Sequence, residues 1–156
     1  VGIVILLVFL AVRYALTYRA AVPFPTTGDV HWYINDAQPR VARLTLHARQ
    51  SSSYRYFTVM INDWASSAPV AMIPVRSGET SVTLMPLGRY RMTIAKGSLW
   101  MGPDKRFGMS GESRVVVHPL EFYQRGNQIY GQSIDLEVPF VGNLETAPEM
   151  TTNPWR

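Results

Sequence analysis

The chain begins with an uninterrupted apolar run, VGIVILLVFLAV at residues 1–12, and this run constrains the fold more than any other feature. Together with residues 13–18 it approaches the roughly 20 residues with which an α-helix spans the hydrocarbon layer of a bilayer. A cleaved signal peptide is the alternative, but no convincing small-x-small cleavage site follows the run. We therefore predict a transmembrane anchor over residues 1–19, and because the chain begins with Val we expect further residues upstream.

Four side chains are predicted to lie at the membrane interface. Arg13 is near the end of the predicted helix, where its stem can carry the charge to the headgroups, and Arg19 follows the helix. Tyr14 and Tyr18 are four residues apart, so they share one helix face at the level where amphipathic rings settle. A general aromatic belt explains these rings better than a lipid-specific site does.

The rest of the chain divides into three parts. Residues 20–28 (AAVPFPTTG) form a short, stiff stalk, because Pro23 and Pro25 prevent helix continuation and favour extended backbone. Residues 29–142 are enough for one domain with one core. Residues 143–156 lack periodicity and form an irregular tail that we expect to lie along a surface or a partner.

From residue 29 onward apolar and polar residues alternate with period two, which is typical of antiparallel strands with one buried face. The predicted strands cover residues 41–49, 54–61, 70–75, 80–84, 89–95, 98–101, 114–118 and 128–138. Their predicted inward side chains include Ala42, Leu44, Leu46, Ala48, Tyr90, Met92 and Ile94. We therefore predict a mainly β fold, an antiparallel β-sandwich preceded by one N-terminal transmembrane helix.

Composition argues against several function classes. Two units of the formal net charge of +4 belong to Arg13 and Arg19, so the domain makes no strong electrostatic case for binding nucleic acid. The chain contains no Cys, which excludes disulfides, thiolate metal sites and a Cys nucleophile. Its basic residues are almost all Arg, the side chain better suited to bidentate contacts, and this favours a contact surface.

The sequence shows no motif for catalysis or for metal or cofactor binding. The three histidines, His31, His47 and His118, are too far apart to give a metal-ligand spacing. The serines form no GxSxG elbow, and no Gly-rich phosphate loop precedes a helix. Asp135 and Glu137 share a strand face and could bracket a sugar, but like charges on a solvent face are commoner. We predict a protein without catalytic residues, metal or cofactor.

Residues 96–111 (KGSLWMGPDKRFGMSG) are a Gly-rich loop in which two cations lie between two aromatic rings. Aromatic rings beside cations are used to bind a protein partner, a glycan or a lipid headgroup. We predict Trp100, Lys105, Arg106 and Phe107 as partner-binding residues. In the alternative, the two rings order the hairpin and cap the open end of the sandwich, since aromatic residues dominate cores as well as interfaces.

The chain also contains five short motifs: SGET at residues 77–80, PLGRYR at 86–91, GSLWMG at 97–102, FG at 107–108 and GNQIYG at 126–131. Together they resemble the motifs of a bacterial family of membrane-anchored β-domain proteins with no established activity. Family members carry PLGxYxxxxAxGxxWYG, LFGPDT and GNQxxGY motifs. In this chain Met101 replaces the Tyr of the first motif, and RFGMSG at residues 106–111 replaces LFGPDT. The resemblance covers about half of the chain and implies a β-rich domain near a membrane segment.

A looser similarity concerns the turns. The GET turn followed by the PLGRY turn is similar to those of PEGA-type and carboxypeptidase-regulatory-like sandwich domains, which are structural or binding modules. This similarity bears on the fold alone.

These features predict a non-catalytic, single-pass accessory or scaffolding subunit of a larger bacterial membrane complex, for example a bioenergetic or secretion assembly. Its partners would be integral membrane subunits and the lipid bilayer, contacted through residues 96–111 and, in the tail, through Trp155 and Arg156. The alternative is a membrane-tethered binding module for a glycan or a lipid headgroup. A hydrolase is a third class, and it needs a convergent polar site.

The orientation in the membrane is the remaining prediction. Arg13 and Arg19 follow the apolar run and favour a cytoplasmic domain by the positive-inside rule. Anchors of this kind usually hold their domain outside, so we predict the bacterial inner membrane with a periplasmic domain and keep the cytoplasmic orientation as the alternative.

Overall fold

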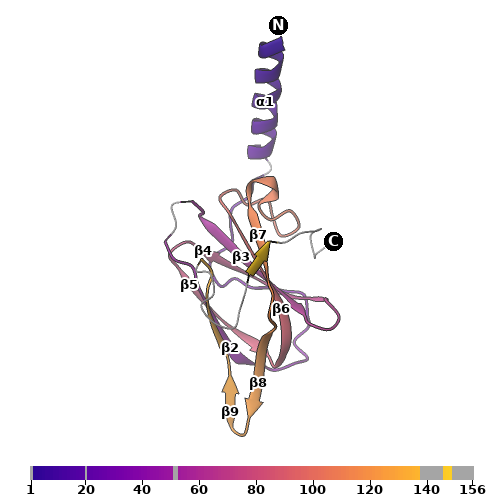
Figure 1. The fold of residues 1–156 in the computed structure, drawn as a ribbon, viewed down its shortest axis with the longest axis vertical. Helices are drawn as coiled ribbons and strands as arrows, with labels where there is room; N and C mark the ends of the chain where they lie inside the picture. Colours follow the sequence, from indigo (N-terminus) through magenta and orange to yellow (C-terminus); the bar gives the residue numbers. More distant parts are fainter. Residues whose placement is uncertain (1, 20, 51–52, 138–145, 149–156) are drawn as a thin grey trace.

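The computed structural model describes residues 2–19, 21–50, 53–137 and 146–148 (Figure 1). Helix α1 spans Gly2–Arg19, and a short 3-10 helix, η1, spans Gly108–Ser110. The strands are β1 (His31–Trp32), β2 (Arg40–His47), β3 (Tyr56–Asp63), β4 (Pro69–Arg76), β5 (Thr80–Pro86), β6 (Gly88–Gly97), β7 (Glu112–Val116), β8 (Leu120–Arg125), β9 (Gln128–Tyr130), β10 (Gln132–Asp135) and β11 (Thr146–Pro148). The predicted mainly β fold is confirmed.

The strands form two sheets. The larger has the order β1-β4-β3-β6-β7-β11, with β8 paired to β6 and β9 paired to β8, and the smaller has the order β10-β2-β5. The pairing is antiparallel, as predicted, except that β10 runs parallel to β2. Gly131, between β9 and β10, lets the chain approach β2 closely enough for β10 to pair with it. A Cβ at this position would lie 2.1 Å from the carbonyl oxygen of Arg43.

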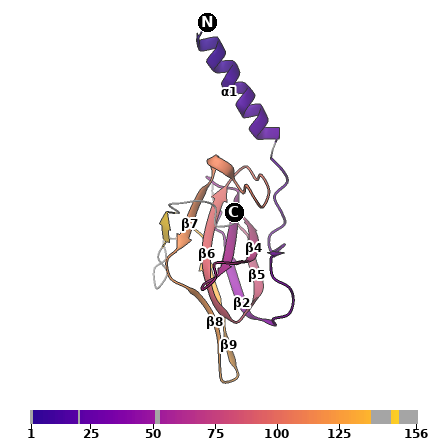
Figure 2. The same ribbon diagram turned by 90° about the vertical axis from the view of Figure 1, so that its right-hand side faces the viewer.

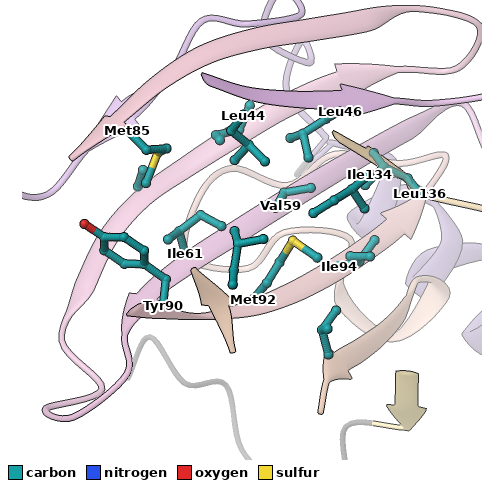
Figure 3. Packing of buried hydrophobic residues seen from close by; sticks show 14 of the residues in the cluster. Leu44, Leu46, Val59, Ile61, Met85, Tyr90, Met92, Ile94, Ile134 and Leu136 are labelled. Atoms are coloured by element: carbon teal, nitrogen blue, oxygen red, sulfur yellow. The ribbon is translucent and has the colours of Figure 1, made fainter. Parts of the chain in front are cut away.

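The main core lies between the two sheets, and Figure 3 shows side chains of β2, β3 and β6 meeting in it. Successive side chains of a strand point to opposite faces, so one face of β2 and of β6 is buried. The buried residues of these two strands include Ala42, Leu44, Leu46, Tyr90, Met92 and Ile94, and Ala48 follows β2 in the same core. The predicted inward faces are therefore confirmed, and each fully buried Leu or Ile contributes about 1.5–3 kcal/mol.

A second apolar cluster covers the outer face of the larger sheet. Its buried members are Phe24, Met60, Met72, Ala95, Trp100 and Phe107. Three of them project from β3, β4 and β6, and the aromatic rings come from the segment before β1 and from the loop after β6. We call these six residues the aromatic cluster. Because this cluster covers the second face, β3 is buried without interruption from Phe57 to Asn62, as strands covered on both faces are.

The segment between α1 and β1 is hydrogen-bonded to the domain along the β4 edge. The N–H of Gly28 donates to the carbonyl of Pro74 at 3.0 Å, and Nη2 of Arg76 donates to the carbonyl of Phe24 at 2.9 Å. Closer to α1, the N–H of Val22 donates to the carbonyl of Trp100 at 2.9 Å. Most of the predicted stalk therefore lies against the domain surface.

Helix α1 projects beyond the β domain in both views (Figures 1 and 2). The large apolar side chains from Ile3 to Val12 are 51–76% exposed, and the guanidinium of Arg13 lies 5.8 Å from the ring centroid of Phe9. In the part of the chain that the structure describes, no helix is long and apolar enough to cross a membrane. The helix predicted for this region is present, and its placement in a membrane stays a prediction.

Five other predicted contacts fall outside what is described. The side chains of Tyr14, Tyr18 and Arg19 lie outside the described part of α1, and Trp155 and Arg156 lie outside the described residues. Within the tail that was predicted to be irregular, residues 146–148 form β11, which pairs with β7.

Candidate functional site

The loop between β6 and β7 was predicted to bind a partner, and the structure buries its two rings. Trp100 is 3% exposed and Phe107 is 2% exposed. Their ring centroids are 5.4 Å apart, and the ring of Phe24 lies 5.2 Å from Trp100 and 6.2 Å from Phe107. These rings hold the loop and the segment after α1 on the outer face of the larger sheet, and a contact with a partner stays a prediction for them.

Glycines at the two ends of the loop make room for Phe107. A Cβ at Gly97 would lie 2.5 Å from Cγ of Phe107, and a Cβ at Gly111 would lie 2.4 Å from its Cβ. Atoms this close cannot be accommodated without a shift of the ring. Packing therefore explains Gly97 and Gly111, whereas Gly102 and Gly108 have φ values of 93° and 56°, which favour glycine.

The loop lies at the end of the β domain next to α1 (Figures 1 and 2), and several of its other side chains are exposed. Lys105 is exposed, Arg106 is half-buried, and Met109 in η1 is fully exposed. The N–H of Arg106 donates to the carbonyl of Gly102, and the N–H of Met101 donates to the carbonyl of Arg106, both at 2.7 Å. The hollow beside them has a volume of about 80 Å³, well below the range of ligand pockets.

A larger pocket, of about 310 Å³, lies at the opposite end of the β domain. We call it the distal pocket. Its lining comes from the segment before β2, the β3–β4 turn with the start of β4, and the start of β6: Ile34, Asn35, Ala37, Gln38, Asp63, Ala68, Pro69, Val70 and Tyr90. Sequence analysis missed this pocket, because three separate segments build it and no motif joins them.

Asp63 forms the polar wall of the distal pocket. Its Oδ2 accepts hydrogen bonds from the N–H of Ser66 at 2.8 Å, from Oγ of Ser66 at 2.9 Å and from the N–H of Ala65 at 3.1 Å. These bonds, the backbone bond of Ser66 first, hold the pKa of Asp63 below its usual value. The group is therefore a carboxylate at neutral pH.

Tyr90 forms the inner wall, at one end of the main core (Figure 3). Its hydroxyl donates to the carbonyl of Pro86 at 3.0 Å. Burial raises the pKa of Tyr90, and the nearby charge of Asp63 raises it further. The ring is therefore a neutral phenol whose hydroxyl is already engaged.

Cation–aromatic pairs surround this end of the domain. The guanidinium groups of Arg91 and Arg89 lie 4.9 and 5.6 Å from the ring centroid of Trp64, and Arg89 also pairs with Glu121 at 2.8 Å. The guanidinium of Arg40 lies 3.7 Å from the ring of Trp32. This surface, unlike the predicted loop, carries partly exposed aromatic rings beside cations.

The β8–β9 hairpin projects from the domain in the direction opposite to α1 (Figures 1 and 2). Tyr123 and Tyr130 stack across its two strands with ring centroids 4.7 Å apart, and both rings are exposed, as is Ile129. The turn uses Gly126 at φ 58°, a conformation that favours glycine. The hairpin therefore presents exposed aromatic and apolar side chains close together.

The strongest catalytic arrangement places His47 between two hydroxyls. Its Nδ1 lies 3.1 Å from Oγ1 of Thr80, and its Nε2 lies 3.1 Å from Oγ of Ser133. His47 is exposed on the smaller sheet, and its ring has no carboxylate partner in the described part of the chain. Asp135, predicted as half of a possible sugar bracket, pairs with Arg49 at 2.7 Å. Among the described residues, no group of three His, Cys, Asp or Glu side chains is placed to hold a metal ion.

Comparison of the chain with protein-family models, with curated proteins and with solved structures finds no match.

Proposed function

We propose that this protein is a membrane-attached, non-catalytic accessory subunit whose β-sandwich domain contacts integral membrane proteins. The observation that carries this proposal is α1. Its apolar side chains lie exposed beyond the β domain, and no described part of the domain covers them. An exposed apolar surface of this size marks a membrane or protein contact. A bacterial inner membrane with the domain in the periplasm is the location we propose.

The two ends of the domain support a division of contacts. Lys105 and Met109 lie at the end next to α1, where a basic side chain and an apolar one suit a headgroup surface. The stacked tyrosines of the β8–β9 hairpin lie at the far end, where a protein partner could pack on them. The domain would therefore face the bilayer with one end and its partner with the other.

Membrane attachment is tested with a matched pair of substitutions on the full chain. Leu7→Arg places a charge in α1, and Val82→Arg places the same charge on β5 at a side chain of similar exposure. We expect the wild type and Val82→Arg to stay with membranes through an alkaline wash and Leu7→Arg to be released, because a charge in a helix is costly in hydrocarbon. Release of the wild type, or retention of Leu7→Arg, would contradict attachment through α1.

The accessory role is tested by purifying the full chain from native membranes in mild detergent and identifying bound proteins by mass spectrometry. A stoichiometric integral membrane protein that survives a salt wash supports the proposal. Recovery of the chain alone contradicts it and favours the tethered binding module.

A further inference from the structure

The distal pocket contains polar atoms that the fold does not use. Oδ2 of Asp63 is occupied by the β3–β4 turn, but Oδ1 of Asp63 has no hydrogen-bond partner among the described residues. Asn35 uses only its side-chain oxygen, which accepts from the N–H of Ala37 at 3.3 Å, and the amide of Gln38 is unpartnered in the same part of the structure. The pocket therefore offers one carboxylate oxygen and two amides to a ligand.

The turn that carries Asp63 is fixed before any ligand arrives. Nδ2 of Asn62 donates to the carbonyl of Ser67 at 2.9 Å, and the N–H of Ser67 donates to the carbonyl of Asp63 at 3.0 Å. Ser67 itself has φ 61°, a conformation that a non-glycine residue adopts only when its surroundings impose it. A rigid wall lowers the ordering cost of binding.

Charge selects the ligand class. Among the described residues of the lining Asp63 is the only charged one, so the lining favours a cationic donor over an anion. A hydrogen bond between a carboxylate and an ammonium group is roughly twice as strong as a neutral one. Ile34, Pro69 and Val70 supply apolar walls for the body of the ligand. A volume of about 310 Å³ is at the lower limit of ligand pockets and fits a small molecule.

We propose that the distal pocket binds the ammonium group of a small polar molecule that carries no negative charge. Oδ1 of Asp63 accepts from the ammonium, and the amides of Asn35 and Gln38 bond to adjacent hydroxyl groups. An amino sugar has this chemistry, and free ethanolamine is a smaller probe that carries the ammonium with a single hydroxyl group. The inference stands apart from the accessory role, because it needs no partner protein.

The test uses defined probes on the purified full chain in detergent, followed by amide correlation spectra. The probes are glucosamine, N-acetylglucosamine, ethanolamine and inorganic phosphate. N-acetylglucosamine is the matched control, because it keeps the ring and loses the positive charge. We expect glucosamine at about 10 mM to shift the amides of residues 34–38 and 63–70, and N-acetylglucosamine and phosphate to bind at least tenfold more weakly. Stronger binding of glucosamine than of ethanolamine shows that the ring hydroxyls take part, and equal binding shows that the ammonium group alone is recognised; both support the ammonium site.

Two substitutions separate the pocket from general charge effects. Asp63→Asn keeps the side-chain oxygen that holds the turn and removes the charge, and we expect it to weaken glucosamine binding about tenfold. Asp36→Asn removes an exposed carboxylate that pairs with Arg40 outside the pocket lining, and we expect unchanged binding. Unshifted wild-type spectra, equal binding of N-acetylglucosamine, or equal affinity of Asp63→Asn and the wild type would each overturn the proposal.

Discussion

The two ends of the β domain use the same residue types in opposite ways. Next to α1, Trp100 and Phe107 are buried over the larger sheet and glycines make room for one of the rings. At the far end, Trp64 remains partly exposed between two arginines, and a pocket opens beside it. The rings of Trp100 and Phe107 are buried because they cover apolar side chains on the outer face of the larger sheet, whereas Trp64 belongs to neither core cluster. Aromatic and basic residues close together in the sequence therefore do not by themselves indicate a binding surface.

The largest expected effect comes from a substitution in the aromatic cluster, at the end of the domain next to α1. Phe107→Ala removes a ring packed among other rings and leaves a cavity, so we expect a loss of about 3–5 kcal/mol in the free energy of unfolding. Trp64→Ala at the far end is the control, and we expect it to cost less than about 1 kcal/mol, mainly its cation–π contacts. Chemical unfolding of the full chain in detergent measures both. Equal losses would contradict the contrast between the two ends.

A smaller effect comes from overfilling the same end. Gly97→Ala puts a methyl group against the ring of Phe107, and we expect a cost of about 1–3 kcal/mol. Combining it with Phe107→Leu should cost less than the sum of the two single changes, because the smaller side chain leaves space for the methyl group. Thermal unfolding of the three variants gives the coupling, and strict additivity would show that the ring and Gly97 do not compete for space.

At the exposed end the expected effect is smaller still. Arg91→Ala removes one cation from the face of Trp64, and we expect a loss of about 0.5–1 kcal/mol with a change in tryptophan fluorescence. Arg43→Ala, an exposed arginine on β2, should change neither. A loss of several kcal/mol for Arg91→Ala would mean that the far end is as tightly packed as the aromatic cluster.

The smallest expected effect is a pH dependence of stability, which can be measured for one carboxyl group at each end of the domain. The pKa of Asp63 is lowered by bonds from Ser66, and the pKa of Glu112 is lowered first by the hydroxyl of Tyr54 and also by Lys96. A carboxyl group whose pKa is lower in the folded than in the unfolded state stabilises the fold at pH values above the unfolded-state pKa of about 4. This contribution is lost as the pH falls through the folded-state pKa. We expect Asp63→Asn and Glu112→Gln each to reduce stability at neutral pH, with differences from the wild type that shrink in acid. Thermal unfolding across this range measures the slopes, and parallel curves would contradict the assignment.

Most of the strands could be predicted because their signal is local, although residues 98–101, predicted as a strand, lie in the loop after β6, and β8 was not predicted. Alternation in β2 and β6 identified the inward faces without knowledge of the partner strands, since each pattern depends only on neighbouring residues. The parallel pairing of β10 with β2 could not be predicted, because it depends on the close approach of Gly131 to the backbone of Arg43. Pairing partners are a property of the whole fold.

The sites were harder to predict for the same reason. Phe24 was assigned to a separate stalk, and only the fold shows that its ring packs with Trp100, 76 positions later in the sequence. The distal pocket joins Asn35, Asp63 and Tyr90 from three distant segments. The only local signal near the distal pocket was the Asn62–Asp63 pair, and in the sequence this pair predicts a turn and not a pocket.

The hydrogen bond from Val22 to Trp100 limits the freedom of the whole domain. Only residues 20 and 21 separate the end of α1 from this bond, and an extended chain advances at most about 3.6 Å per residue. The reach between helix and domain is therefore about 11 Å, too short for the domain to turn over. If α1 sits in a bilayer, the end of the domain that carries Trp100 stays within this reach of the end of α1, and the distal pocket lies at the end away from the lipid.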